Sequence, residues 1–155
     1  MKHYVNSILL FSIVLLLWLL SGFIFEINLD YYNLLSLPNY TLSGNYISII
    51  WFIIYITNSI SIILILRKYN IFKNYDYLYI LLTTYLSSQL FLYFFFYLMS
   101  PFLGFIITVV TFISSIFWFL ETKKLNKLAS YFVLPYIIYS LYAVILMTHV
   151  YVINF

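Results

Sequence analysis

Few residues of this chain could take part in chemistry, and those that could are aromatic rings, amides and hydroxyls. Trp51, Tyr55 and Asn58 follow one another at i, i+4 and i+7, which places them on one face of a helix. An indole and a phenol each combine an apolar body with a polar tip, so they can stack on a flat apolar molecule and hydrogen-bond to its edge. This face predicts one wall of a binding pocket. The alternative is that it holds two helices together.

A second polar face surrounds Gln89, the single glutamine of the sequence. Tyr85, Ser88, Gln89 and Leu92 share a helix face at i, i+3, i+4 and i+7. An amide inside an apolar run is costly unless it meets another polar group. We therefore expect this face to point toward other polar groups of the protein.

The residue types needed for other chemistry are missing. The sequence has no cysteine, no glycine-rich phosphate loop, no carboxylate pair and no set of metal ligands at a suitable spacing. His149 lies near the end of the last apolar run, where an interfacial hydrogen bond and ligation of haem or a metal are alternative roles. The sequence therefore predicts no catalytic residue, no metal site and no cofactor.

Five long apolar runs must position these side chains. They cover residues 4–25, 46–66, 77–98, 102–119 and 129–153 in a chain that is 66% hydrophobic and 7% charged. Each run is about 18 to 25 residues long, enough for a helix to cross a hydrocarbon core of about 30 Å. The first run is too long for the core of a signal peptide, and no cleavage site of the A-x-A type follows it. We predict an all-α membrane protein, with a single five-helix transmembrane domain over residues 1–155.

The basic residues fix the predicted orientation. They occur only before the first run, between the second and third, and between the fourth and fifth: Lys2, Arg67, Lys68, Lys73, Lys123, Lys124 and Lys127. Cytoplasmic connections carry such an excess, so the N-terminus is predicted inside and the C-terminus outside. We expect a multi-pass protein of the cytoplasmic membrane of a prokaryote. A nucleic-acid partner is not expected, because these charges flank the apolar runs.

The connections carry further predictions. Residues 26–43 form the longest one, with Tyr31, Tyr32 and Pro38 and no basic residue, and they are predicted to form a functional outer loop or lid. The alternative is a flexible spacer. The connection at Ser100 and Pro101 is very short, so the third and fourth runs should be adjacent and antiparallel. In the fifth run, a proline at position 135 should open or kink the helix.

The abundance of aromatic residues is not by itself a binding signal. The 18 tyrosines and 16 phenylalanines are also what an AT-rich gene would encode, and tyrosine favours membrane interfaces. Trp118, near the inner end of the fourth run, is expected to contribute little to a pocket at the outer end. The argument for a site therefore depends on the ordered polar and aromatic positions.

Several of these positions, taken in chain order, resemble a known family. They are Tyr31-Tyr32, Leu37-Pro38-Asn39-Tyr40, Trp51, Gln89, Leu134-Pro135-Tyr136-Ile137-Ile138-Tyr139 and Asn154. The sequence is similar over about residues 29–154 to the translocator protein family, also called the tryptophan-rich sensory protein, TspO/MBR or peripheral benzodiazepine receptor family.

The resemblance implies a five-helix membrane bundle, often a homodimer, that binds porphyrins such as protoporphyrin IX beneath the first outer loop. By this resemblance Trp51 is a pocket tryptophan, Tyr32 a rim aromatic and Gln89 a pocket amide, while Tyr139 stands where the family has tryptophan and Ala143 follows as in the family. The predicted ligand-binding residues are Tyr31, Tyr32, Pro38, Trp51, Tyr55, Tyr85, Ser88, Gln89, Tyr139 and Ala143.

Some positions depart from the family pattern. Residues 40–44 lack the family's prolines, Tyr85 and Ser88 stand where asparagines are usual, and no basic residue follows Tyr151. A pocket of similar shape and altered chemistry is therefore expected. Three functions remain open: a sensory or transport protein that binds a porphyrin-type or other flat apolar ligand, an enzyme that degrades porphyrin in light, and a membrane adaptor that has lost ligand binding.

Overall fold

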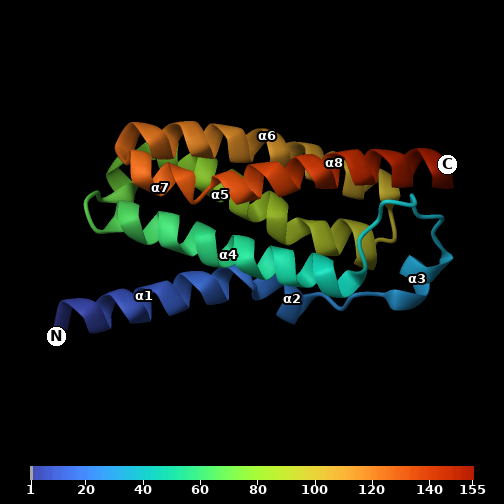
Figure 1. The fold of residues 1–155 in the computed structure, drawn as a ribbon, viewed down its shortest axis with the longest axis horizontal. Helices are drawn as coiled ribbons and strands as arrows, with labels where there is room; N and C mark the ends of the chain where they lie inside the picture. The colour runs from blue at the N-terminus through green and yellow to red at the C-terminus, as the bar shows by residue number, and fades with distance from the viewer. Residues whose placement is uncertain (1) are drawn as a thin grey trace.

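A computed structural model describes the backbone of residues 2–155 and the side chains of residues 7–155. In that part of the chain all regular elements are helices (Figure 1). They are α1 (Lys2–Trp18), α2 (Leu20–Ile24), α3 (Leu29–Leu34), α4 (Gly44–Leu66), η1 (Ile71–Lys73), α5 (Tyr75–Leu92), η2 (Tyr93–Tyr97), α6 (Pro101–Leu125), α7 (Lys127–Tyr131) and α8 (Leu134–Asn154).

Four helical segments of the described chain are long and apolar enough to cross a membrane. They are Gly44–Leu66, Tyr75–Tyr97, Pro101–Leu125 and Lys127–Asn154. They correspond to the second to fifth predicted runs, and this supports an integral membrane protein. The fourth run extends beyond its predicted end at residue 119, to Leu125, because Thr122 and the two lysines after it continue the helix.

The first apolar run differs from the prediction of one continuous helix. It is divided at Leu19 into α1 and α2, and its apolar helical part, Ser7–Trp18, is shorter than the other four. Together α1 and α2 cover residues 2–24, about 34 Å at the rise of an α-helix. The first segment is therefore long enough to cross a hydrocarbon core of about 30 Å only if α1 and α2 are taken together.

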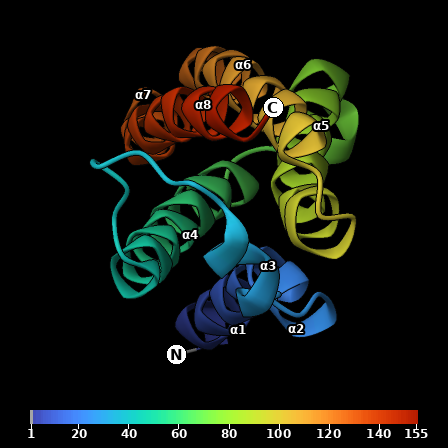
Figure 2. The same cartoon turned by 90° about the vertical axis from the view of Figure 1, so that its right-hand side faces the viewer.

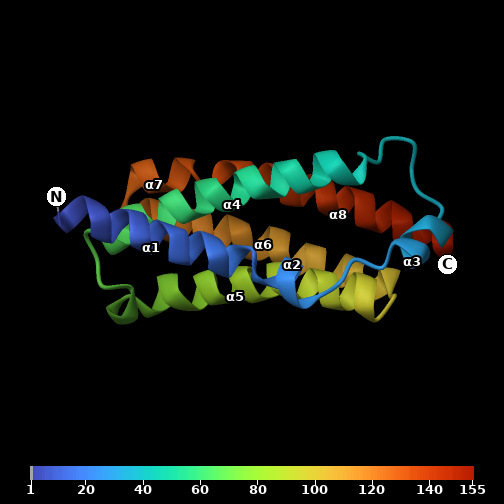
Figure 3. The same ribbon diagram turned by 90° about the horizontal axis from the view of Figure 1, so that it is seen from below.

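The helices form an elongated bundle with two different ends. The N-terminus, α7 and the end of α4 lie at one end, and α3 and the C-terminus lie at the other (Figures 1 and 3). The first end carries Arg67, Lys68, Lys73, Lys123, Lys124 and Lys127, and we call it the basic end. The opposite end, covered by residues 25–43, is called the loop end.

Viewed from the loop end, α5, α6 and α8 form one side of the bundle, and α1, α2 and α4 form the other (Figure 2). The α5–α6 and α6–α8 pairs make the most extensive contacts, and α1 packs on α4. The short turn before Pro101 makes α5 and α6 adjacent and antiparallel, as predicted. Ser100 caps α6, because its hydroxyl oxygen accepts the Leu103 backbone N–H at 3.2 Å.

Small side chains let the helices approach closely. Along α6, Thr108, Thr111, Ser114 and Ser115 are buried toward its neighbours. At Gly104 a Cβ atom would lie 2.8 Å from a ring carbon of Phe95 and 2.9 Å from the methyl carbon of Met147. A side chain at position 104 would therefore have to displace the side chain of Phe95 or Met147, where α6 passes η2 and α8.

The predicted interruption of the fifth run at Pro135 is confirmed. Helix α7 ends at Tyr131 and α8 begins at Leu134, so Pro135 lies in the first turn of a new helix, where its missing N–H costs nothing. The outer connection also contains structure that was not predicted. Asn28 caps the short helix α3 by accepting the Tyr31 backbone N–H at 2.9 Å.

Candidate functional site

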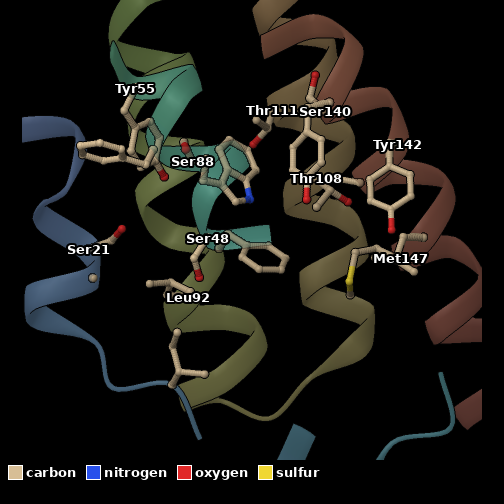
Figure 4. A pocket seen from close by; sticks show the side chains of 18 of the residues that line it. Ser21, Ser48, Tyr55, Ser88, Leu92, Thr108, Thr111, Ser140, Tyr142 and Met147 are labelled. Carbon is tan, nitrogen blue, oxygen red and sulfur yellow. The ribbon is translucent and has the colours of Figure 1, made fainter. Parts of the chain in front are cut away.

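A cavity of about 380 Å³ lies between the helices in the half of the bundle nearer the loop end. Its walls come from α4, α5, α6 and α8, with Leu19, Ser21, Gly22 and Ile27 closing one side (Figure 4). The lining is mostly apolar, as is usual for sites that bind flat organic molecules.

Aromatic rings form the wall shared by α4 and α8. The Trp51 ring lies 5.3 Å from the Tyr139 ring, nearly perpendicular at 89°, and 5.7 Å from the Tyr55 ring. Trp51 also contacts Tyr136 edge to face at 5.9 Å. Tyr136 is fully buried, so the wall rests on a rigid aromatic core.

That aromatic core extends away from the cavity. Trp18 stacks on Tyr55 at 5.6 Å and lies 6.1 Å from Trp118, and Trp118 contacts Tyr136 at 6.3 Å. Trp118 is 0% exposed. Trp118 is absent from the cavity lining, as expected, and it forms part of the core behind the cavity wall.

Hydroxyl groups provide the polar part of the lining. Thr108 donates to the carbonyl of Phe105 at 2.7 Å, Thr111 to that of Ile107 at 2.8 Å, and Ser140 to that of Ile137 at 3.0 Å. These three side chains and Ser88 surround the cavity (Figure 4). Because the protons of the first three are engaged within their own helices, their oxygens can serve a ligand as acceptors.

Gln89 and Tyr85 contact the first helix, and the cavity lining includes neither of them. The Gln89 amide accepts the Ser21 backbone N–H at 2.8 Å and donates to the Trp18 carbonyl at 3.1 Å. The Tyr85 hydroxyl donates to the Leu17 carbonyl at 3.0 Å. These bonds satisfy backbone groups at the break between α1 and α2. Tyr85 and Gln89 therefore position the part of the cavity wall that contains Ser21.

Tyr31 and Tyr32 lie on α3 at the loop end, outside the cavity lining. Their rings pack on Phe95 at 5.6 Å and on Phe96 at 6.2 Å. Burial raises the pKa of the Tyr31 hydroxyl above its ordinary value, and it raises the pKa of the Tyr32 hydroxyl in the same direction, with a smaller contribution from Tyr142. Both phenols are therefore neutral at physiological pH, and they form a cover over the α5 end of the bundle.

The rest of the outer connection is fastened to α8. Asn154 accepts the Ser36 backbone N–H at 2.9 Å and donates to the Ser36 carbonyl at 3.0 Å. Tyr142 accepts the Leu42 backbone N–H at 3.2 Å and donates to the Tyr40 carbonyl at 3.3 Å. We call this set of contacts the loop clamp. It argues against the alternative of a flexible spacer.

Two further predicted positions belong to the same region. Pro38 begins a turn in which its carbonyl accepts the Thr41 backbone N–H at 2.9 Å, outside the cavity lining. His149 bonds through Nδ1 to the Tyr40 hydroxyl, so its described partner is a loop residue.

The structure thus brings together half of the predicted ligand-binding residues. Trp51, Tyr55, Ser88, Tyr139 and Ala143 line the cavity. Asn58, on the same predicted face as Trp51, is fully buried outside the lining.

The sequence did not predict the lining from α6 or most of the lining from α8. Thr108 and Thr111 lie three residues apart on one face of α6, a spacing that is equally typical of residues that only pack helices together. Leu146 and Met147 carry no signal beyond hydrophobicity. The lining residues that were not predicted include Phe91, Leu92, Thr108, Thr111, Tyr142, Leu146 and Met147.

Comparison with known proteins agrees with an integral membrane protein. The chain is 30% identical over 146 residues to the uncharacterized membrane protein YtaB of Bacillus subtilis strain 168, covering 94% of both chains. It is 27% identical over 149 residues to the tryptophan-rich protein TspO of Bacillus cereus, covering 96% of this chain and 97% of the relative. Residues 8–152 match the TspO/MBR family, and the chain belongs to that family.

Proposed function

We propose that the protein binds a flat, mostly apolar molecule of the porphyrin type in the cavity beneath the outer loop, in a sensory, regulatory or transport role. The observation that carries this proposal is the aromatic wall of Trp51, Tyr55 and Tyr139 around a cavity of about 380 Å³. The Trp51 and Tyr139 rings meet edge to face, which leaves ring faces on which a planar ligand can stack. Membership of the TspO/MBR family supports the same class of ligand.

The proposal assigns different roles to the predicted residues. Trp51, Tyr55, Ser88, Tyr139 and Ala143 would touch the ligand directly. Tyr31, Tyr32 and Pro38 would cover it from the loop side, and Tyr85 and Gln89 would hold the wall formed by the first helix. The homodimer implied by the family resemblance stays a prediction.

We further propose that α1 and α2 together form a fifth crossing, with the N-terminus inside and the C-terminus outside. The placement of all basic residues in alternate connections supports this topology. A C-terminal alkaline phosphatase fusion should be active, and a C-terminal fluorescent protein fusion should be dark. The reverse pair of results would contradict five crossings, since an even number returns the C-terminus to the cytoplasm.

Ligand binding is tested by titrating purified protein with a porphyrin and following its absorbance and the tryptophan fluorescence, in the dark and in light. Saturable binding that Trp51→Ala weakens supports a ligand-binding protein. Product formation under light would support the enzyme instead. Absence of saturable binding by any porphyrin would leave the membrane adaptor as the remaining function.

A further inference from the structure

A second cavity of about 320 Å³ lies at the basic end, between η1, the beginning of α5 and the end of α6. The segment that joins α4 to α5 forms part of this end of the bundle (Figure 3). The lining of this cavity contains two cations and two carboxylates, on Lys73, Lys124, Asp76 and Glu121. The lining of the first cavity has no charged residue in the described part of the chain. The second cavity therefore suits a ligand of different chemistry.

The four charges of the second cavity are not all paired. The Lys124 ammonium lies 2.5 Å from the Glu121 carboxylate, and this is the single ion pair within the described chain. Lys73 and Asp76 line the cavity without an ion-pair partner among the described residues. A ligand with one anionic and one cationic group can pair with both of them. A ligand of one sign pairs with one and leaves the other unpaired.

Lys73 and the beginning of α5 are neighbours in the chain, and both favour an anion. The first backbone N–H groups of an α-helix have no partner within the helix and carry a partial positive charge. Asn74, at the N-cap of α5, makes no capping hydrogen bond, and its side-chain amide instead donates to the Asn70 carbonyl at 2.9 Å. The beginning of α5 can therefore hold a phosphate group.

A buried phenol adds a hydrogen-bond donor to the same lining. Tyr77 lines the cavity and is 1% exposed, and its hydroxyl makes no hydrogen bond of ordinary geometry among the described residues. The polar neighbour of this hydroxyl is the indole N–H of Trp118, which can only donate. The phenolic proton of Tyr77 is therefore left for an acceptor such as a phosphate oxygen.

The position of the cavity indicates that its ligand is a lipid. One of the segments long enough to cross a membrane begins at Tyr75 and another ends at Leu125, and both residues line the cavity. The cavity therefore lies at the level of the lipid headgroups. Exposed aromatic side chains continue from it along both helices, because Tyr79, one turn into α5, is 66% exposed and Phe117, one turn before Glu121, is 52% exposed. Acyl chains would lie against this apolar surface, and a soluble ligand would not use it.

We infer that this cavity binds the headgroup of a phosphatidylethanolamine, a phospholipid that carries a phosphate and a primary ammonium, in the leaflet at the basic end. Lys73 and the beginning of α5 bind the phosphate, with Tyr77 as a further donor. Asp76 binds the ammonium, whose N–H groups donate to a carboxylate. A headgroup with a phosphate alone leaves Asp76 unpaired beside it. This site is separate from the first cavity and does not depend on the function proposed there.

The direct test adds lipids to the full-length protein in a neutral detergent and measures the lipids retained by native mass spectrometry. Phosphatidylethanolamine should be retained at least about tenfold more tightly than phosphatidylglycerol with the same acyl chains, which lacks the ammonium. Equal or tighter retention of phosphatidylglycerol would overturn the inference, because general attraction to the basic end would then explain binding. Displacement of the lipid by an equal concentration of soluble phosphoethanolamine would also overturn it, since the acyl chains would then contribute nothing.

Asp76→Asn tests the contact with the ammonium, because it removes the charge and keeps the size of the side chain. The preference for phosphatidylethanolamine over phosphatidylglycerol should fall at least about threefold. Asp30→Asn, in the first turn of α3 at the loop end, is the matched control and should leave the preference unchanged. Equal effects of the two variants would show that the charge of the whole protein, and not the cavity, sets the preference, and the inference would fail.

Lys73→Gln tests the contact with the phosphate. It should weaken the retention of phosphatidylethanolamine at least about threefold. Lys68→Gln, at the basic end and outside the cavity lining, is the matched control and should leave retention unchanged. Helical circular dichroism equal to that of the unmodified protein confirms that each variant is folded. Equal losses in Lys73→Gln and Lys68→Gln would overturn the assignment of the phosphate to this cavity.

Discussion

The side-chain amide of Gln89 replaces two backbone partners of the first helix, accepting from Ser21 at 2.8 Å and donating to Trp18 at 3.1 Å. In a continuous helix the Ser21 N–H would bond to Leu17, and the Trp18 carbonyl would accept from Gly22. Gly22 instead donates to the Leu19 carbonyl at 3.1 Å. The helix can therefore break beside the cavity without leaving these backbone groups unsatisfied in an apolar environment.

Replacement of Gln89 by leucine should destabilise the protein. The change keeps the approximate volume but leaves the Ser21 N–H and Trp18 carbonyl without partners, at a cost of about 1 to 3 kcal/mol for each group. Thermal unfolding in detergent should show a lower Tm. Leu82→Ala on the same helix, at a side chain that is 44% exposed, is the control and should change Tm little. Equal losses would contradict the role of the amide.

The sequence predicted the fold better than it predicted the site. The break in the first helix illustrates the reason, because it depends on residues that are distant in the sequence. Apolar length predicted five long helices, of which the structure shows four as long apolar helices and divides the first at Leu19. The proline at position 135 predicted the interruption of the last run. Nothing local distinguishes Leu19 from its neighbours, because leucine is a strong helix former. The break depends on Tyr85 and Gln89 from α5, which are distant in sequence, so local periodicity could not reveal it.

Trp51→Ala should weaken porphyrin binding by more than about tenfold, which corresponds to about 1.4 kcal/mol. The physical reason is the loss of the ring that contacts Tyr55 and Tyr139 in the cavity wall. Binding is measured by titration with a porphyrin, followed by its absorbance. Phe117→Ala, at a side chain that is 52% exposed on α6, is the control. Similar losses in both variants would indicate general destabilisation.

Trp118 would be an unsuitable control for this experiment. Its position along the chain predicted a site near the inner surface, but its indole is completely buried between Trp18 and Tyr136. Removing so large a buried ring costs about 3 to 5 kcal/mol. The position of a residue in the sequence indicates its depth along one helix. It does not show which rings from other helices pack against that residue.

Release of the loop clamp should expose the outer connection. Asn154→Leu removes both hydrogen bonds to Ser36, so backbone amides of residues 35–42 should exchange faster with deuterium, while those of α4 should not change. Ile153→Ala, at a side chain that is 52% exposed, is the matched control. Unchanged exchange in Asn154→Leu would mean that Tyr142 and His149 alone hold the loop.

The two glycines Gly104 and Gly22 should respond oppositely to alanine. At Gly104 the new Cβ would press on Phe95 and Met147, and such overpacking typically costs about 1 to 3 kcal/mol. At Gly22 no atom lies within 4 Å of the added carbon, so alanine should be neutral or stabilising, since it restricts the unfolded chain. Thermal unfolding of both variants measures the difference. An unchanged Tm in Gly104→Ala would contradict the close packing described for α6.

Tyr139 should control any photochemistry of a bound porphyrin. Its ring lies 5.3 Å from that of Trp51, in the position where the family pattern has tryptophan. A phenol retains the aromatic face needed for stacking, but it is harder to oxidise than an indole, so it should donate an electron to an excited porphyrin less readily. We expect the protein to bind porphyrin and to degrade it slowly in light.

Tyr139→Trp should raise the rate of degradation with little change in affinity, and Trp51→Phe should abolish the remaining activity. The measurement is loss of porphyrin absorbance under illumination, with the amount of bound porphyrin matched between variants. Equal rates for the unmodified protein and Tyr139→Trp would show that Trp51 is sufficient and that residue 139 serves only as part of the wall.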